Sequence, residues 1–169
     1  MKKKGKLIAA AAVMVLAVVF CVSYTHWPRS WNAISGDREW QISSSYLLIS
    51  TVDHGKSGFD QWTMNTSDLT ASIESAVFST LNSGTYRASL RNLINKTMFK
   101  TSSWSGDGGE ICLWLMRQSE EMSVYIYGSG NIVIPRRNGQ EYLTIYQTDP
   151  GVYEQLKEVL QTHGTFRDE

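Results

Sequence analysis

The chain has 169 residues, of which 42% are hydrophobic and six are tryptophan, a composition typical of an ordered globular protein. Four of its 16 basic residues precede Leu7 and all 16 acidic residues follow Val22, so the part beyond Val22 carries 12 basic and 16 acidic residues, a net charge of −4. This mildly acidic balance argues against a nucleic-acid partner, and the length that remains, about 145 residues, is the usual size of one domain.

The N-terminus has the pattern of a membrane anchor or a signal peptide. Residues 1–6 contain four lysines, and an apolar run without charge or proline follows from Leu7 to Val22. Lysines before an apolar run mark the side that stays in the cytoplasm. We therefore predict a cytoplasmic basic segment at 1–6 and a transmembrane anchor or signal peptide at 7–24, with the rest of the chain outside the cell.

The end of the apolar run bears on whether it is cleaved. Signal peptidase prefers small residues just before the cut, and the best match, Cys21-Val22-Ser23, lacks the usual alanines. This favours a single-pass protein of the cell membrane, with secretion after cleavage as the alternative. Lipid attachment at Cys21 is a further alternative, opposed by Phe20, which stands where lipoprotein signals have a small residue.

Residues 25–38 contain proline, serine and glycine without a sustained period, which indicates a juxtamembrane connector. The extracytoplasmic domain is therefore expected over 39–169.

A strand pair is predicted at the start of this domain. Trp40 and Ile42 alternate with polar neighbours, and a compact apolar run follows from Tyr46 to Val52. A turn at 53–58 then allows residues Gln61 to Met64 to return as a short strand.

A helix is predicted over 69–81, where apolar residues recur at helical spacing. The side chains of Thr66 to Asp68 are expected to cap its start, and Asn82 and Gly84 to end it. For the next segment, 85–100, we predict a shorter helix followed by the entry to a strand.

From Glu110 onward the pattern predicts strands. They are expected at 111–116, 122–127, 131–134 and 141–147. The first is apolar on both alternating faces, as in a central strand that is buried on two sides. The glycines at 128–130 and the hairpin signal Asn138-Gly139 separate the others, which favours an antiparallel meander.

Asp149 and Pro150 predict the start of a last helix, which Gly164 ends. Its apolar stripe consists of Val152, Leu156, Val159 and Leu160.

The order of these elements predicts an α+β fold, in which an antiparallel sheet (meander) has two main helices packed on one face. Behind a lysine-rich anchor, this order resembles the small membrane-anchored or lipoprotein-like extracytoplasmic modules of unknown function from Firmicutes. The resemblance covers Trp40 to His163, and it rests on Thr66 to Asp68, Gly128 to Ile134, Tyr142, and Asp149 to Leu160. It implies a fold and a location, and no catalytic residue comes with it.

Asp53 and His54 are the candidate acid and base of a small envelope hydrolase, because histidine beside a carboxylate is a common proton shuttle. No Gly-x-Ser-x-Gly motif supplies a nucleophile, and the two residues also fit a solvated turn. Three scattered histidines offer no ligand pair with the spacing of a zinc site. The sequence therefore predicts no catalytic residue, no metal site and no cofactor.

Three groups of residues are candidates for binding or for the core. The basic segment consists of Arg87, Arg91, Lys96 and Lys100 and fits either an anionic lipid or wall surface or a solvated helix face. The aromatic residues Trp62, Trp104, Tyr125, Tyr127, Tyr142 and Tyr146 fit either sugar stacking or the packing of a sheet. Cys112 stands among apolar neighbours and is predicted to be a buried, unreactive thiol.

These observations favour a noncatalytic, membrane-anchored extracytoplasmic module that binds a protein partner or a polymer of the cell envelope. A small envelope hydrolase that uses His54 and Asp53, and a glycan-binding surface, are the alternatives. A contiguous apolar or aromatic patch on the open face of the sheet favours protein binding. A concave pocket with a nucleophile or metal near His54 favours the hydrolase, and two or more coplanar exposed aromatic rings favour the glycan.

Overall fold

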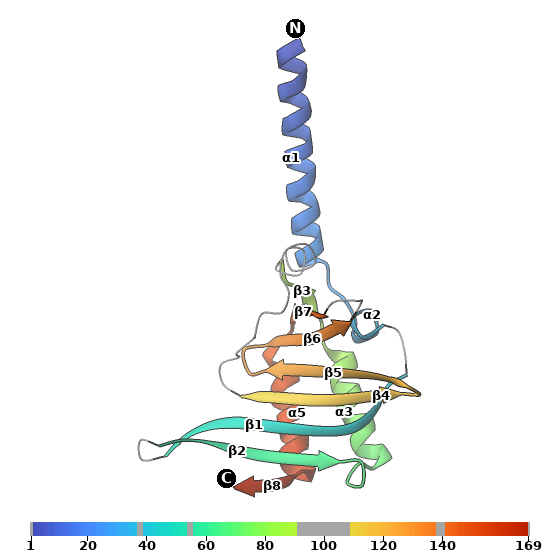
Figure 1. Cartoon of the computed structure of the whole chain (residues 1–169), viewed down its shortest axis with the longest axis vertical. Coiled ribbons are helices and arrows are strands. Elements are labelled where there is room, and N and C mark those ends of the chain that lie inside the picture. The colour runs from blue at the N-terminus through green and yellow to red at the C-terminus, as the bar shows by residue number, and fades with distance from the viewer. Residues whose placement is uncertain (1, 37–38, 54–55, 91–108, 138–140, 169) are drawn as a thin grey trace.

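The computed structural model describes residues 2–36, 39–53, 56–90, 109–137 and 141–168. One long helix, α1 (Lys2–His26), projects from a domain in which helices cover one face of an eight-stranded sheet (Figure 1). All strand pairs recorded in this sheet are antiparallel. The predicted α+β fold with an antiparallel sheet is confirmed.

The strands lie in the order β3-β7-β6-β5-β4-β1-β2-β8. Their bounds are β1 (Gln41–Asp53), β2 (Lys56–Asn65), β3 (Arg87–Ala88), β4 (Glu110–Arg117), β5 (Glu120–Tyr127), β6 (Asn131–Arg137), β7 (Glu141–Gln147) and β8 (Thr165–Asp168). Strands β4 to β7 follow one another as neighbours, which confirms the predicted meander. Gly130 has a φ of 79° and its N–H donates to the Tyr127 carbonyl, so the glycine turn forms as expected; Asn138-Gly139 lies outside the described residues.

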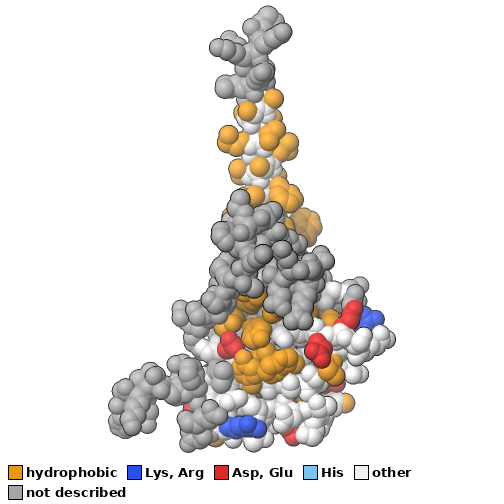
Figure 2. Space-filling view, in the orientation of Figure 1, with side chains coloured by type: hydrophobic (Ala, Val, Ile, Leu, Met, Phe, Trp, Pro, Cys, Tyr) orange, Lys and Arg blue, Asp and Glu red, His pale blue; other side chains and the backbone are white. Residues whose placement is uncertain are grey.

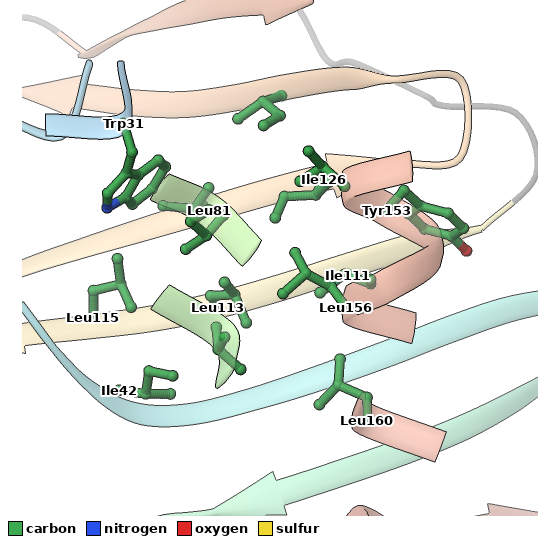
Figure 3. Close-up of a cluster of buried hydrophobic side chains, with 14 of the residues drawn as sticks. Trp31, Ile42, Leu81, Ile111, Leu113, Leu115, Ile126, Tyr153, Leu156 and Leu160 are labelled. Atoms are coloured by element: carbon green, nitrogen blue, oxygen red, sulfur yellow. The ribbon is translucent and has the colours of Figure 1, made fainter. Parts of the chain in front are cut away.

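The main core lies between the sheet and two helices, α3 (Ala71–Ser83) and α5 (Pro150–His163), which stand behind the sheet in Figure 1. Alternate residues of β4, namely Ile111, Leu113 and Leu115, point into this core and are fully buried. Figure 3 shows them facing Leu156 and other side chains of the helices. Each such aliphatic side chain contributes about 1.5–3 kcal/mol of burial free energy, so this layer holds the domain together.

Helix α3 begins two residues later than the sequence predicts. Thr70, rather than Thr66 to Asp68, is the N-cap, and its hydroxyl accepts from the Ile73 N–H. Asp68 instead accepts from the Asn65 N–H and closes the turn after β2. Glu74 in the first turn of α3 accepts from the Ile42 N–H at 2.9 Å, next to the point where the β1–β4 register shifts, and so ties the helix to the sheet.

Helix α5 matches its prediction, with Asp149 as N-cap and Pro150 in the first turn. Its buried side chains are Val152, Tyr153, Leu156 and Leu160. A short strand that the sequence analysis missed, β8, follows Gly164 and pairs with β2 at the edge of the sheet.

The helix predicted over 85–100 is wrong in the part that the structure describes. Tyr86 forms a bridge with Arg29, and Arg87 and Ala88 form β3, which pairs with β7. Tyr86 and Ala88 are both buried, with the exposed Arg87 between them, which is the alternation of a strand at the sheet edge. Residues 91–100 lie outside the described part of the chain.

The predicted connector, 25–38, takes part in the fold. It contains a short helix, α2 (Trp31–Ser35), capped by Ser30, and both Trp31 and Ile34 belong to the main core. Packing therefore begins at Trp31 rather than near Glu39. Sequence alone assigned Trp31 to the connector, because a single buried turn has too few residues to show a period.

Candidate functional site

In the part of the chain that the structure describes, no helix lies on the second face of the sheet, and partly exposed apolar side chains gather there on β1, β4 and β5. Trp114 is 37% exposed and Met116 is 43% exposed, and the half-buried Tyr46 and Tyr125 lie beside them. We call Tyr46, Trp114, Met116 and Tyr125 the open-face patch. In Figure 2 hydrophobic side chains fill the middle of this face, with acidic side chains on either side.

Strand register explains why these residues meet. Tyr46 of β1 and Tyr125 of β5 both stand directly opposite Cys112 of β4, so the three form one row across the sheet. The Tyr46 and Trp114 rings lie 5.2 Å apart with a 55° tilt between their planes. Aromatic pairs at such distances stabilise a sheet surface, so the patch is a firm platform rather than a set of loose side chains.

Buried groups support the patch on its β6 side. Tyr127, Val133 and Ile145 form a second small core on the open face, and Tyr125 and Leu143 pack against it. Exposure on this face therefore increases from the buried side chains of this cluster to the half-buried aromatic ring of Tyr125.

Glu110 is the polar centre of this face. The Tyr46 hydroxyl donates to Glu110 Oε1, and Tyr127 is hydrogen-bonded to the same carboxylate. Burial raises the pKa of both tyrosines above the ordinary value, and the nearby Glu110 adds to the shift. Both hydroxyls therefore stay protonated as donors, which holds the carboxylate in place beside the patch.

Cys112 lies beneath the two tyrosines with 0% exposure, so its predicted burial is confirmed. Burial, reinforced by the Glu110 charge, raises the pKa of the thiol from 9.0 to about 12. A nucleophilic cysteine needs a lowered pKa, because the thiolate is the reactive form, so this thiol is unsuited to covalent catalysis.

A small hollow of about 190 Å³ adjoins the patch and is lined by Ser43, Ser44, Trp114, Leu115, Met116 and Glu121. Small-molecule sites usually have 300–1,000 Å³, so this volume suits one inserted side chain better than a separate ligand. Glu121 at its rim gives the hollow an acidic side.

A second, wider hollow of about 850 Å³ lies at the β3 end of the sheet. Its lining is mostly polar and includes Arg87, Gln147, Thr148 and Asp149. The Asp149 carboxylate already accepts from the Gly151 N–H, so the start of α5 has an anion of its own and does not form an anion site.

No protein-family model, curated protein or solved structure matches this chain.

The candidate acid and base are not placed together by the structure. Asp53 ends β1 opposite Lys56, at the far end of the β1–β2 hairpin, and His54 lies outside the described residues. Neither hollow described above includes a residue of that hairpin tip. Among the described residues, no group of three or more His, Cys, Asp or Glu side chains is arranged to hold a metal ion.

The binding candidates are dispersed. Arg87 is exposed on β3 beside the wider hollow, whereas Arg91, Lys96 and Lys100 lie outside the described residues.

Of the aromatic candidates, Tyr125 and Tyr127 are on the open face, although Tyr127 is buried. Trp62 and Tyr146 pack against the main core. Trp104 and the side chain of Tyr142 lie outside the described part of the structure.

Sequence analysis missed Tyr46, Trp114 and Met116 as surface residues. It expected 111–116 to be buried on both faces, which holds from Ile111 to Leu113 but not at Trp114 and Met116. The alternation of β4 gives the face of each residue, but only the strand register and the packing around each side chain decide which residues are exposed.

Proposed function

We propose that this protein is a noncatalytic module, anchored in the cell membrane, that docks a protein partner on the open-face patch outside the cell. The observation that carries the proposal is the exposure of Trp114 and Met116 on a face of the sheet that no described helix covers. Aromatic and methionine side chains around a small hollow are typical of the centre of protein interfaces.

The N-terminal helix supports the anchor. The stretch Ile8–His26 of α1 has a mean hydropathy of 2.4 and contains no Asp, Glu, Lys or Arg, and none of it is buried in the domain. Its 19 residues extend about 28 Å as a helix, close to the thickness of a bilayer core. A signal sequence has the same properties. The contacts between Arg29 and Tyr24 favour the uncleaved anchor, because cleavage near Ser23 would put Tyr24 at a new N-terminus without the preceding turns of α1 that hold it in place.

The glycan alternative has less support. Sugar rings stack on flat aromatic platforms, but the Tyr46 and Trp114 planes are tilted by 55°. The hydrolase alternative lacks an assembled acid, base and nucleophile among the described residues, and the buried thiol of Cys112 is protonated at neutral pH.

Site-specific photocross-linking tests the proposal. A photoreactive amino acid at Met116 of the full chain should give an adduct with a discrete protein in native membranes. The same group at Glu158, an exposed residue of α5 on the other side of the domain, is the matched control and should not give it. The Met116 adduct should fall about tenfold with Trp114→Ala, because central aromatic residues contribute about 1–2 kcal/mol or more to binding. An adduct of equal yield at both positions contradicts docking at the patch.

A further inference from the structure

We infer that the partner is itself anchored in the same membrane and meets the open-face patch side-on, through an apolar surface that carries basic side chains. This inference rests on the proposed function and adds the class of partner and its direction of approach. It follows from the joint between α1 and the domain and from the charges around the patch.

The joint leaves α1 very little freedom relative to the domain. The Trp27 N–H still donates to the Ser23 carbonyl at 3.0 Å, so helical bonding runs to Trp27. The Arg29 N–H donates to the Tyr86 carbonyl at 2.8 Å, and the Tyr86 N–H donates to the Arg29 carbonyl at 3.0 Å. Only Pro28 stands between these bonded residues, and the proline ring fixes its own φ.

Side chains on both sides of Pro28 reinforce the joint. The Arg29 guanidinium donates to the Tyr24 carbonyl at 3.2 Å and lies 4.8 Å from the centre of the Tyr24 ring. On the domain side, the Trp31 ring lies 6.0 Å from that of Tyr86, and both residues are almost fully buried. Tyr86 also donates from its hydroxyl to the Leu81 carbonyl, so the joint is continuous with α3.

A fixed joint sets the direction in which the open face looks. In Figure 1 the strands run across the axis of α1 and succeed one another away from it, from β3 to β8. The broad faces of the sheet therefore stand along that axis, and with α1 upright in a bilayer they look sideways over the membrane surface. β4 is four strand spacings from β3, which puts Trp114 roughly 20 Å from the membrane-side edge of the sheet.

The charges beside the patch specify the partner's chemistry. Among the described side chains of β4 and β5, the charged groups on the open face are the carboxylates Glu110 and Glu121. The described arginines that the register puts on the same face, Arg87 of β3 and Arg167 of β8, stand at the two ends of the sheet, away from the patch. A second copy docked face to face would bring these carboxylates together, and like charges in an interface are unfavourable. An apolar segment with lysine or arginine side chains is complementary, with one side chain seated beside Glu121 in the hollow next to Trp114.

A spacer at the joint separates this inference from the proposed function. A flexible Gly-Ser spacer of about eight residues, inserted between Trp27 and Pro28 of the full chain, lets the domain turn and move by about 15 Å. The matched control places the same spacer between Lys4 and Gly5, where it leaves the joint intact. Both chains carry the photoreactive group at Met116, and the membranes are washed with concentrated salt and returned to low salt before irradiation.

We expect the adduct to survive the salt wash, to contain a protein with its own membrane-spanning segment, and to fall about tenfold with the spacer at the joint but not with the control spacer. An adduct that disappears with the salt wash, or that is insensitive to the spacer at the joint, overturns the membrane-anchored partner and leaves docking at the patch intact. An adduct of two copies of this chain overturns the partner class. No Met116 adduct above the Glu158 level, in unwashed membranes and without a spacer, overturns the proposed function itself.

Discussion

Replacing Trp31 with alanine tests whether the folded domain begins at the joint with α1. Trp31 is 2% exposed, whereas Trp27, on the same short segment, is 69% exposed. Burial of a tryptophan removes about 200 Å² from water, which is worth about 5 kcal/mol at 25 cal/mol per Å². Truncations of buried tryptophan cost about 3–5 kcal/mol, so we expect Trp31→Ala to lower the free energy of unfolding by that amount.

The assay is thermal unfolding of the detergent-solubilised full chain, followed by near-UV circular dichroism. For a unit of about 140 residues the unfolding entropy is about 0.3 kcal/mol per K, so Trp31→Ala should lower Tm by about 10–17 °C. Trp27→Ala is the matched control, because it removes the same side chain from an exposed position, and it should shift Tm by less than about 2 °C. Equal shifts for the two variants refute a core that includes the joint.

Four further outcomes follow from the fold and the patch. Leu156→Ala opens a cavity at a residue with 1% exposure and should lower the free energy of unfolding by about 2–5 kcal/mol. Lys157→Ala removes only an ion pair at the surface and should lower it by less than about 0.5 kcal/mol. Chemical denaturation measures both values. Cys112 should resist maleimide labelling at pH 8 until the protein is denatured; rapid labelling of the native chain contradicts its burial. The pKa of the Cys112 thiol is about 12 in the folded state and 9.0 in the unfolded state, so the folded state retains the proton to higher pH. The thiol's contribution to stability is therefore complete below about pH 9 and declines as pH rises toward 12. Cys112→Ala should flatten the start of that decline in a pH series of Tm values. Glu121→Lys should lower the cross-linking yield at the patch several-fold while changing Tm by less than about 2 °C; an unchanged yield contradicts a basic partner.

The helices with the clearest local signals were predictable because the signals lie within a few residues of one another. The Asp149 cap, Pro150 and the stripe through Leu156 fix α5 in sequence and in structure alike. The same holds for the positions of β4 and β5 along the chain and for the glycine turn before β6. Local pattern failed where the element is too short to show a period, as in α2, β3 and β8.

The sequence predicted the type of site, an apolar or aromatic patch on the open face of the sheet, but not most of the residues that form it. The sequence by itself determined an apolar N-terminal helix, an antiparallel sheet with helices on one face, and a net charge of −4 for the residues beyond Val22. Tertiary structure alone decided that Arg29 closes the sheet edge at Tyr86 and that Tyr46 meets Glu110 beside an uncovered Trp114. These contacts join residues far apart in the chain, and their formation depends on strand order and register, which no local spacing encodes.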